Sequence, residues 1–149
     1  MRYDTIMANT KVKKSMQTQI EIEIPFYDLD PMQVVWHGNY VKYLERGRCA
    51  LLDKLGMTYS DMAAAGLAFP IVKLNVKYIR PCVFGQKILV QTTLLPSENF
   101  LIFNYKIMDA STNTVLCKAE TKQMAVEIAT QNTLYVIPQP FLGIIQEAA

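Results

Sequence analysis

The chain has 149 residues, of which 51% are hydrophobic, and its formal net charge is +2. This length fits one domain with a substantial core. The near-neutral charge, with no long basic run, argues against a protein that binds nucleic acid.

Cysteine usage and the first residues restrict the class of protein further. Cys49, Cys82 and Cys117 show no CxxC spacing, which argues against a disulfide framework and a zinc site. We expect all three to be buried, reduced thiols. Residues 1–19 lack the apolar core of a signal peptide, and no apolar run approaches the roughly 18 residues of a membrane span. These features predict a cytoplasmic protein without an integral membrane segment.

The first half of the chain predicts a tail, a strand and a long helix. Residues 1–16 are polar and without clear period, which indicates a mobile N-terminal tail before a single domain over residues 17–149. Isoleucines alternate with glutamates over residues 17–26, as in a strand with one buried face. After a loop, Asn39 is the expected N-cap of an amphipathic helix that ends before Gly56. A shorter helix is expected over residues 58–65.

One residue of the long helix predicts how closely it packs. Gly47 lies on the apolar side of the helix, although glycine inside a helix costs about 1 kcal/mol relative to alanine. A strand that approaches the helix backbone closely would explain this residue.

The second half alternates with the period of strands. Strands are predicted over residues 72–78, 87–95, 100–108 and 114–128, separated by turn-forming segments, with a helical turn or two near residue 141. One long helix followed by a meander of strands indicates an α+β fold, in which an antiparallel sheet of about five strands wraps around one central helix. So small a sheet leaves an edge strand exposed, and this predicts edge-to-edge pairing between two copies of the chain.

The candidate site lies in the loop before the long helix. This loop holds Asp28, Asp30 and the only histidine of the chain, His37. A carboxylate can act as base or nucleophile, an imidazole can hold or donate a proton near neutral pH, and a helix start offers unpaired N–H donors. The alternative for Asp30 is turn chemistry, in which its carboxylate accepts local backbone N–H groups. His37 is equally well interpreted as a structural histidine, and Asp28 as a structural group.

The sequence resembles the hot-dog fold 4-hydroxybenzoyl-CoA thioesterase family, specifically its short-chain acyl-CoA branch. The resemblance extends over nearly the whole chain after Gln17. It is carried by Asp28-Leu29-Asp30-Pro31-Met32-Gln33-Val34-Val35-Trp36-His37-Gly38-Asn39-Tyr40 with the following Tyr43, Leu44, Glu45, Arg46 and Arg48, and by Val76-Lys77-Tyr78-Ile79-Arg80-Pro81 with Gly85. Two positions depart from the family pattern: Phe26 stands where relatives have tyrosine, and Gln33 where many have glycine.

The resemblance implies an acyl-CoA thioesterase that needs no cofactor and no metal. It places the catalytic carboxylate on Asp30 and a second catalytic group on His37, with the helix N-terminal amide near His37 polarising the thioester carbonyl. The residues expected to bind substrate are Val35, Trp36, Gly38, Asn39, Lys73, Lys77 and Arg80. The last three could meet the phosphates of coenzyme A, although a solvated sheet face is an equally good interpretation.

Several alternatives remain open at this point. The same residues would serve an acyl-carrier-protein thioesterase, which would meet its protein partner through a basic rim. A non-catalytic acyl-CoA binding protein could keep the same fold. Short-chain, medium-chain and aromatic acyl groups all fit the sequence, as do a homodimer and a homotetramer.

Overall fold

The computed structural model describes residues 16–148. The expected tail therefore lies outside the described residues except for Met16, which is buried. The helices and strands follow in the order β1 (Gln17–Glu23), the 3-10 helix η2 (Phe26–Asp28), α2 (Asn39–Leu55), α3 (Tyr59–Ala64), β2 (Leu67–Ala68), β3 (Ile71–Tyr78), β4 (Lys87–Leu95), β5 (Phe100–Asp109), β6 (Val115–Glu127), β7 (Thr133–Leu134) and α4 (Phe141–Ala148).

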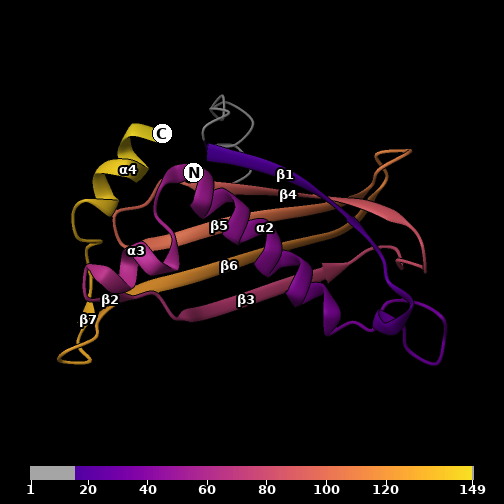
Figure 1. Ribbon diagram of the computed structural model, residues 1–149, viewed down its shortest axis with the longest axis horizontal. Helices are drawn as coiled ribbons and strands as arrows, with labels where there is room; N and C mark the ends of the chain where they lie inside the picture. The colour runs from indigo at the N-terminus through magenta and orange to yellow at the C-terminus, as the bar shows by residue number, and fades with distance from the viewer. Residues whose placement is uncertain (1–15, 149) are drawn as a thin grey trace.

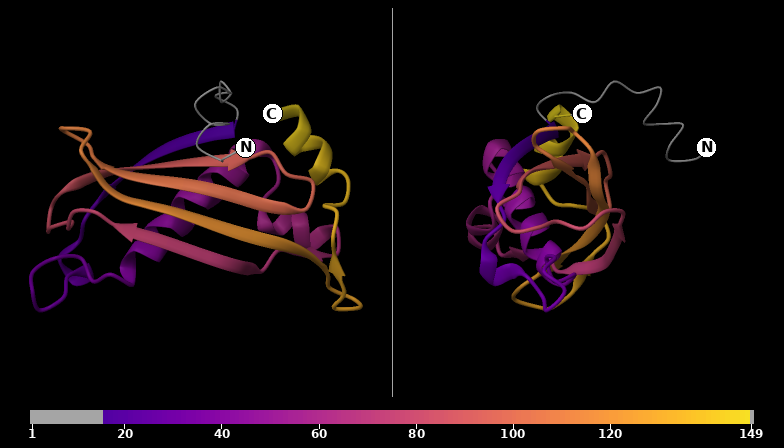
Figure 2. Two further views of the ribbon diagram at one scale, coloured as in Figure 1. Left: turned by 180° about the vertical axis from the view of Figure 1, so that it is seen from behind. Right: turned by 90° about the vertical axis from the view of Figure 1, so that its right-hand side faces the viewer.

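The strands form one antiparallel sheet around α2. Strands β1, β4, β5 and β6 are neighbours in that order, β3 pairs with β6, and the two-residue strands β2 and β7 also pair with β6. Helix α2 lies across one face of this sheet (Figure 1), and the end-on view in Figure 2 shows the strands curving around it. Five long strands around one long helix confirm the predicted hot-dog fold.

The core lies between α2 and the sheet because both contribute one apolar face. In β5, every second residue over positions 101–107 is buried. These residues are Leu101, Phe103, Tyr105 and Ile107, and the residues between them are more exposed. Full burial of each large apolar side chain stabilises the fold by about 1.5–3 kcal/mol. None of the helices in the described part of the chain is long and apolar enough to cross a membrane.

Gly47 confirms the expected close approach between α2 and the sheet. A Cβ atom at this position would lie 2.4 Å from Thr92 Oγ1 and 2.8 Å from Val90 Cγ1, both on β4. We expect Gly47→Ala to lower the free energy of unfolding by about 2 kcal/mol, because overpacking outweighs the better helix propensity of alanine. Urea denaturation measures this change, with the exposed Arg46→Ala as control. A variant as stable as the parent would contradict the tight packing.

Two expectations for the helix and the cysteines were wrong. Gly38, not Asn39, is the N-cap of α2. Cys49 is exposed, whereas Cys82 and Cys117 are buried free thiols as expected. On the same helix, Arg48 is buried, with 3% of its surface exposed.

Arg48 belongs to a polar network inside the core. It forms an ion pair with Glu45, and its Nε donates to Tyr59 Oη at 2.7 Å. Its Nη1 lies 3.4 Å from Tyr105 Oη, which in turn lies 2.7 Å from Thr121 Oγ1. Burial disfavours the charge of Arg48, but the neighbouring Tyr105, Tyr59 and Glu45 outweigh this effect, so the pKa of Arg48 lies above its ordinary value. The charged guanidinium therefore ties α2 to α3 and β5.

Candidate active site

The loop before α2 folds back on itself around Asp30. Leu29 and Val35 form an isolated antiparallel bridge, and the Asp30 N–H donates to Val34 O at 2.8 Å. The Gln33 N–H donates to Asp30 O at 3.0 Å, and Gln33 has a φ of 66°. This left-handed backbone suits glycine, the residue that many relatives were expected to carry here, and it costs a larger residue about 1 kcal/mol.

Asp28 attaches the loop to α2. Its buried carboxylate accepts hydrogen bonds from Lys42 Nζ and Tyr43 Oη, both at 2.6 Å. Its backbone oxygen accepts the Trp36 N–H at 3.0 Å and the Asn39 side-chain amide at 2.8 Å. Burial alone would raise the pKa of Asp28, but the bonds from Lys42 and Tyr43 outweigh it and lower the pKa. These contacts agree with the structural role interpreted from the sequence.

Asp30 and His37 line the same open hollow, which has a volume of about 300 Å³. Its lining residues come from the loop, the start of α2, the end of β3 and the segment that follows: Asp30, Met32, Val34, Val35, His37, Tyr40, Tyr78, Ile79, Arg80 and Pro81. One carboxylate oxygen of Asp30 accepts the Met32 N–H at 2.8 Å, so the turn chemistry considered above is present. The other oxygen has no hydrogen-bond partner among residues 16–148. It is therefore available to a molecule in the hollow.

The first residues of α2 leave backbone donors unused. The Asn39 N–H bonds to Trp36 O at 2.9 Å and the Tyr40 N–H to His37 O at 3.4 Å. Within the described chain, the N–H groups of His37 and Gly38 have no acceptor. Such unpaired amides, together with the helix dipole, favour a negative charge placed next to them.

The half-exposed Trp36 covers Gly38. A Cβ atom on Gly38 would lie 2.3 Å from the indole ring, so any larger residue here would displace the tryptophan. Trp36, Gly38 and Asn39, which were expected to bind substrate, are not among the residues that line the hollow.

Two tyrosines that the sequence did not single out complete the site. The Tyr78 hydroxyl donates to His37 O at 2.8 Å, across 41 residues of sequence. The Tyr78 ring packs edge-on against Tyr40, with 4.9 Å between centroids, and lies 6.3 Å from the His37 ring. The Tyr40 hydroxyl accepts the Cys82 N–H at 3.3 Å, and burial raises the pKa of both tyrosines. Strand alternation assigns Tyr78 to a face, but no local signal shows that it reaches His37.

The basic residues expected to bind substrate lie apart. Arg80 lines the hollow with Asp30 and His37. Lys73 lies 3.5 Å from Glu120 in an ion pair, and Lys77 lines a different hollow, described below. No group of three or more metal-binding side chains occurs within residues 16–148.

A sheet wrapped around one long helix is the arrangement of the hot-dog class of proteins. The model of the thioesterase-like superfamily matches residues 24–143. The chain belongs to this superfamily, and the class of enzyme is thioester hydrolase.

Individual thioesterases resemble this chain in sequence and in structure. The chain is 32% identical over 108 residues to YneP of Bacillus subtilis, named "Putative acyl-CoA thioesterase", covering 72% of this chain and 78% of that protein. It is 28% identical to the acyl-CoA thioester hydrolase YbgC of Escherichia coli O157:H7, covering 71% and 79%. Among solved structures, the DHNA-CoA thioesterase of Staphylococcus aureus superposes with a TM-score of 0.77 at 26% identity, covering 89% and 87%.

Proposed function

We propose that the protein hydrolyses the thioester of an acyl-CoA to a free acid and coenzyme A, with Asp30 and His37 as the catalytic residues. The observation that carries this proposal is their position: both line one hollow at the start of α2, next to the unpaired N–H groups of His37 and Gly38. The sequence similarity to acyl-CoA thioester hydrolases supports the choice of substrate class.

Each group has a defined task in this reaction. The Asp30 carboxylate either attacks the thioester carbonyl carbon, so that the C–S bond breaks, coenzyme A leaves as its thiolate and water then cleaves the mixed anhydride, or it removes a proton from a water that attacks the carbonyl and expels the same thiolate. In both routes the carbonyl oxygen becomes an oxyanion, and the N–H group of His37 at the start of α2 stabilises it. Loss of one such donor typically raises the barrier by about 3 kcal/mol. The His37 ring positions the water or carbonyl, and an imidazole N–H can donate a proton to the departing thiolate.

Tyr78 is expected to position this helix start. The Tyr78→Phe substitution removes the hydroxyl that holds His37 O but keeps the ring on Tyr40. One lost hydrogen bond is worth about 0.5–1.5 kcal/mol, so kcat should fall up to about tenfold while KM changes little. Steady-state kinetics measure this split, with the exposed Tyr135→Phe as control. An unchanged kcat would show that the His37 peptide holds its position without Tyr78.

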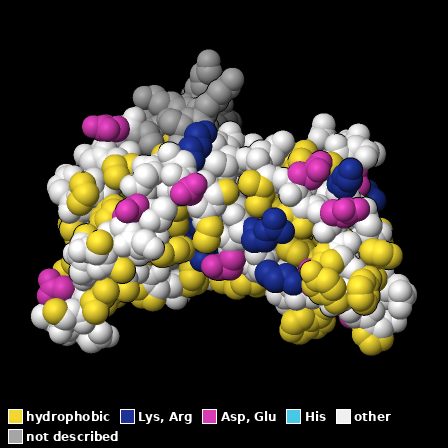
Figure 3. All heavy atoms as spheres, in the orientation of Figure 1, with side chains coloured by type: hydrophobic (Ala, Val, Ile, Leu, Met, Phe, Trp, Pro, Cys, Tyr) yellow, Lys and Arg dark blue, Asp and Glu magenta, His cyan; other side chains and the backbone are white. Residues whose placement is uncertain are grey.

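We also propose that two copies pair along β3. Among the described strands, β3 pairs only with β6, and seven of its eight residues are exposed, including Ile71, Val72 and Leu74. An unpaired apolar edge of this kind is normally covered by another strand. Figure 3 shows further hydrophobic side chains gathered over the end of the molecule that holds the loop before α2. A homotetramer would join two such dimers.

A turnover screen tests the proposed function. Purified protein is assayed for thiol release with acyl-CoA substrates from acetyl-CoA to palmitoyl-CoA and with benzoyl-type CoA thioesters. The same acyl groups are then assayed as thioesters of acyl carrier protein. Hydrolysis of CoA thioesters in preference to carrier-protein thioesters is the expected result. Preference for the carrier protein would establish the alternative substrate, and binding without any turnover would establish a non-catalytic binding protein.

A further inference from the structure

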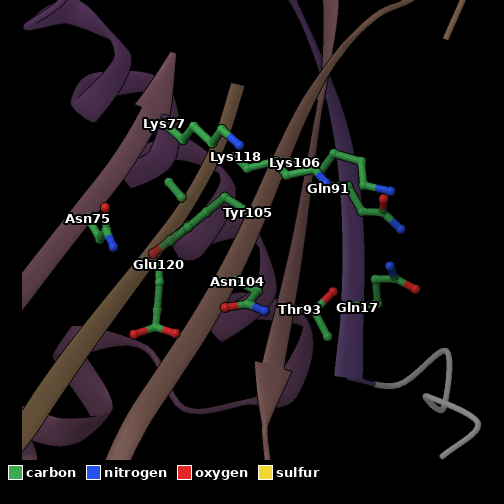
Figure 4. Close-up of a pocket in the computed structure, with 11 residues that line it drawn as sticks. Gln17, Asn75, Lys77, Gln91, Thr93, Asn104, Tyr105, Lys106, Lys118 and Glu120 are labelled. Carbon is green, nitrogen blue, oxygen red and sulfur yellow. The ribbon is translucent and has the colours of Figure 1, made fainter. Parts of the chain in front are cut away.

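A second hollow, with a volume of about 450 Å³, lies on the outer face of the sheet. Its most exposed lining residues include Lys77 on β3, Lys118 on β6 and Lys106 on β5. Lys106 is exposed between the buried Tyr105 and Ile107, so its side chain points away from α2. Figure 4 shows the three lysines side by side across their strands. The proposed catalytic residues do not line this hollow.

The three lysines are in direct register. Lys77 pairs with Lys118 across β3 and β6, and Lys118 pairs with Lys106 across β6 and β5. Neighbouring strands are about 4.8 Å apart, so the three side chains leave the sheet along a row of roughly 10 Å. Like charges directly opposite each other destabilise a sheet.

No carboxylate within residues 16–148 forms an ion pair with this row of three lysines. The one carboxylate of the hollow, Glu120, is paired with Lys73 at 3.5 Å. The row therefore carries an uncompensated positive charge that an anion of matching length would stabilise.

We propose that this hollow binds a small ligand with two or more phosphate groups, such as a nucleoside diphosphate or the nucleotide part of a coenzyme. Phosphates that follow one another along a chain match three ammonium groups in a row, whereas a single carboxylate would meet only one or two. The volume lies within the range of about 300–1,000 Å³ of small-molecule pockets. The amides of Gln91, Asn75 and Asn104 lie in the same hollow and can contact the uncharged part of such a ligand.

This site is separate from the proposed active site. Tyr78, whose hydroxyl bonds to His37 O, follows Lys77 in β3. Consecutive residues of a strand point to opposite faces, so the two hollows lie on opposite sides of the same strand. Binding at the lysines therefore does not require the catalytic chemistry, and it can be measured in the Asp30→Asn variant.

The test is binding of tripolyphosphate, ADP, adenosine 3′,5′-bisphosphate and coenzyme A, measured by calorimetry and by the rise in melting temperature at low salt. We expect binding by the parent and by Asp30→Asn, weakening as salt is added. Lys118→Gln removes the central charge, so the ligand-free protein should melt at a higher temperature while each ligand binds at least tenfold more weakly. The exposed Lys87→Gln on β4, outside the hollow, is the matched control and should bind like the parent.

The ligands distinguish two sources of phosphate. If coenzyme A binds and Lys118→Gln raises the KM for acyl-CoA, the site takes the nucleotide of the substrate. If ADP or the free bisphosphate binds while that KM is unchanged, the site takes a free nucleotide. Absence of binding by all four compounds at millimolar concentration, or equal binding by parent and Lys118→Gln, would overturn the proposal.

Discussion

Asp30→Asn is expected to lower kcat for acyl-CoA hydrolysis by about a thousandfold, because a positioned base or nucleophile contributes roughly 10²–10⁴ to the rate. Asparagine has the same shape, and its carbonyl oxygen can still accept the Met32 N–H that Asp30 accepts at 2.8 Å. The turn should therefore persist, and only the charge at the free oxygen is lost. Substrate should bind with little change in affinity, as measured with a non-hydrolysable thioether analogue.

Controls separate this effect from misfolding. The exposed Asp53→Asn, on α2, removes a carboxylate outside the hollow and should keep the activity of the parent. Urea denaturation should give Asp30→Asn a free energy of unfolding within about 1 kcal/mol of the parent. If Asp30→Asn keeps more than a tenth of the parent's kcat, Asp30 is a turn residue only and its catalytic assignment fails.

Local patterns predicted the elements of the fold because strand and helix periods are local properties. The predicted strand over residues 87–95 coincides with β4, and Gly56 ends α2 in a left-handed conformation. Alternation over residues 72–78 predicted a strand, and β3 is that strand, although nearly all of its residues are exposed. The reason is its position at the edge of the sheet, which the order of elements alone does not reveal.

The site was only partly predictable because its contacts join distant segments. The motif brought Asp30 and His37 to attention, and both line one hollow. Their role in catalysis stays a prediction. The bond from Tyr78 to His37 O depends on where β3 ends relative to α2, and no sequence period carries that information. For the same reason the sequence did not separate Arg80, which follows β3 and lines this hollow, from Lys77 within β3, which lines the other hollow.

Asp28→Ala is expected to lower the free energy of unfolding by about 3 kcal/mol. The substitution leaves the buried Tyr43 hydroxyl without its acceptor, which costs about 1–3 kcal/mol, and removes the charge-assisted bond from Lys42. Lys42 is half exposed and can turn to solvent, so its share is small. Two milder variants should each lower the free energy of unfolding by about 1 kcal/mol. Asp28→Asn keeps an acceptor for the Tyr43 hydroxyl, and Tyr43→Phe removes that donor.

The pH dependence of stability identifies the ionised carboxylate as the cause. The pKa of Asp28 is lowered below its ordinary value of 3.8 in the folded protein, so the unfolded chain takes up the proton first as the pH falls. The stabilisation by this group is complete above the ordinary pKa and is lost as the pH falls below it. Urea denaturation should therefore show the largest difference between parent and Asp28→Asn near neutral pH, with the difference shrinking below about pH 4. A difference that is constant with pH would mean that Asp28 holds the loop by shape and not by charge.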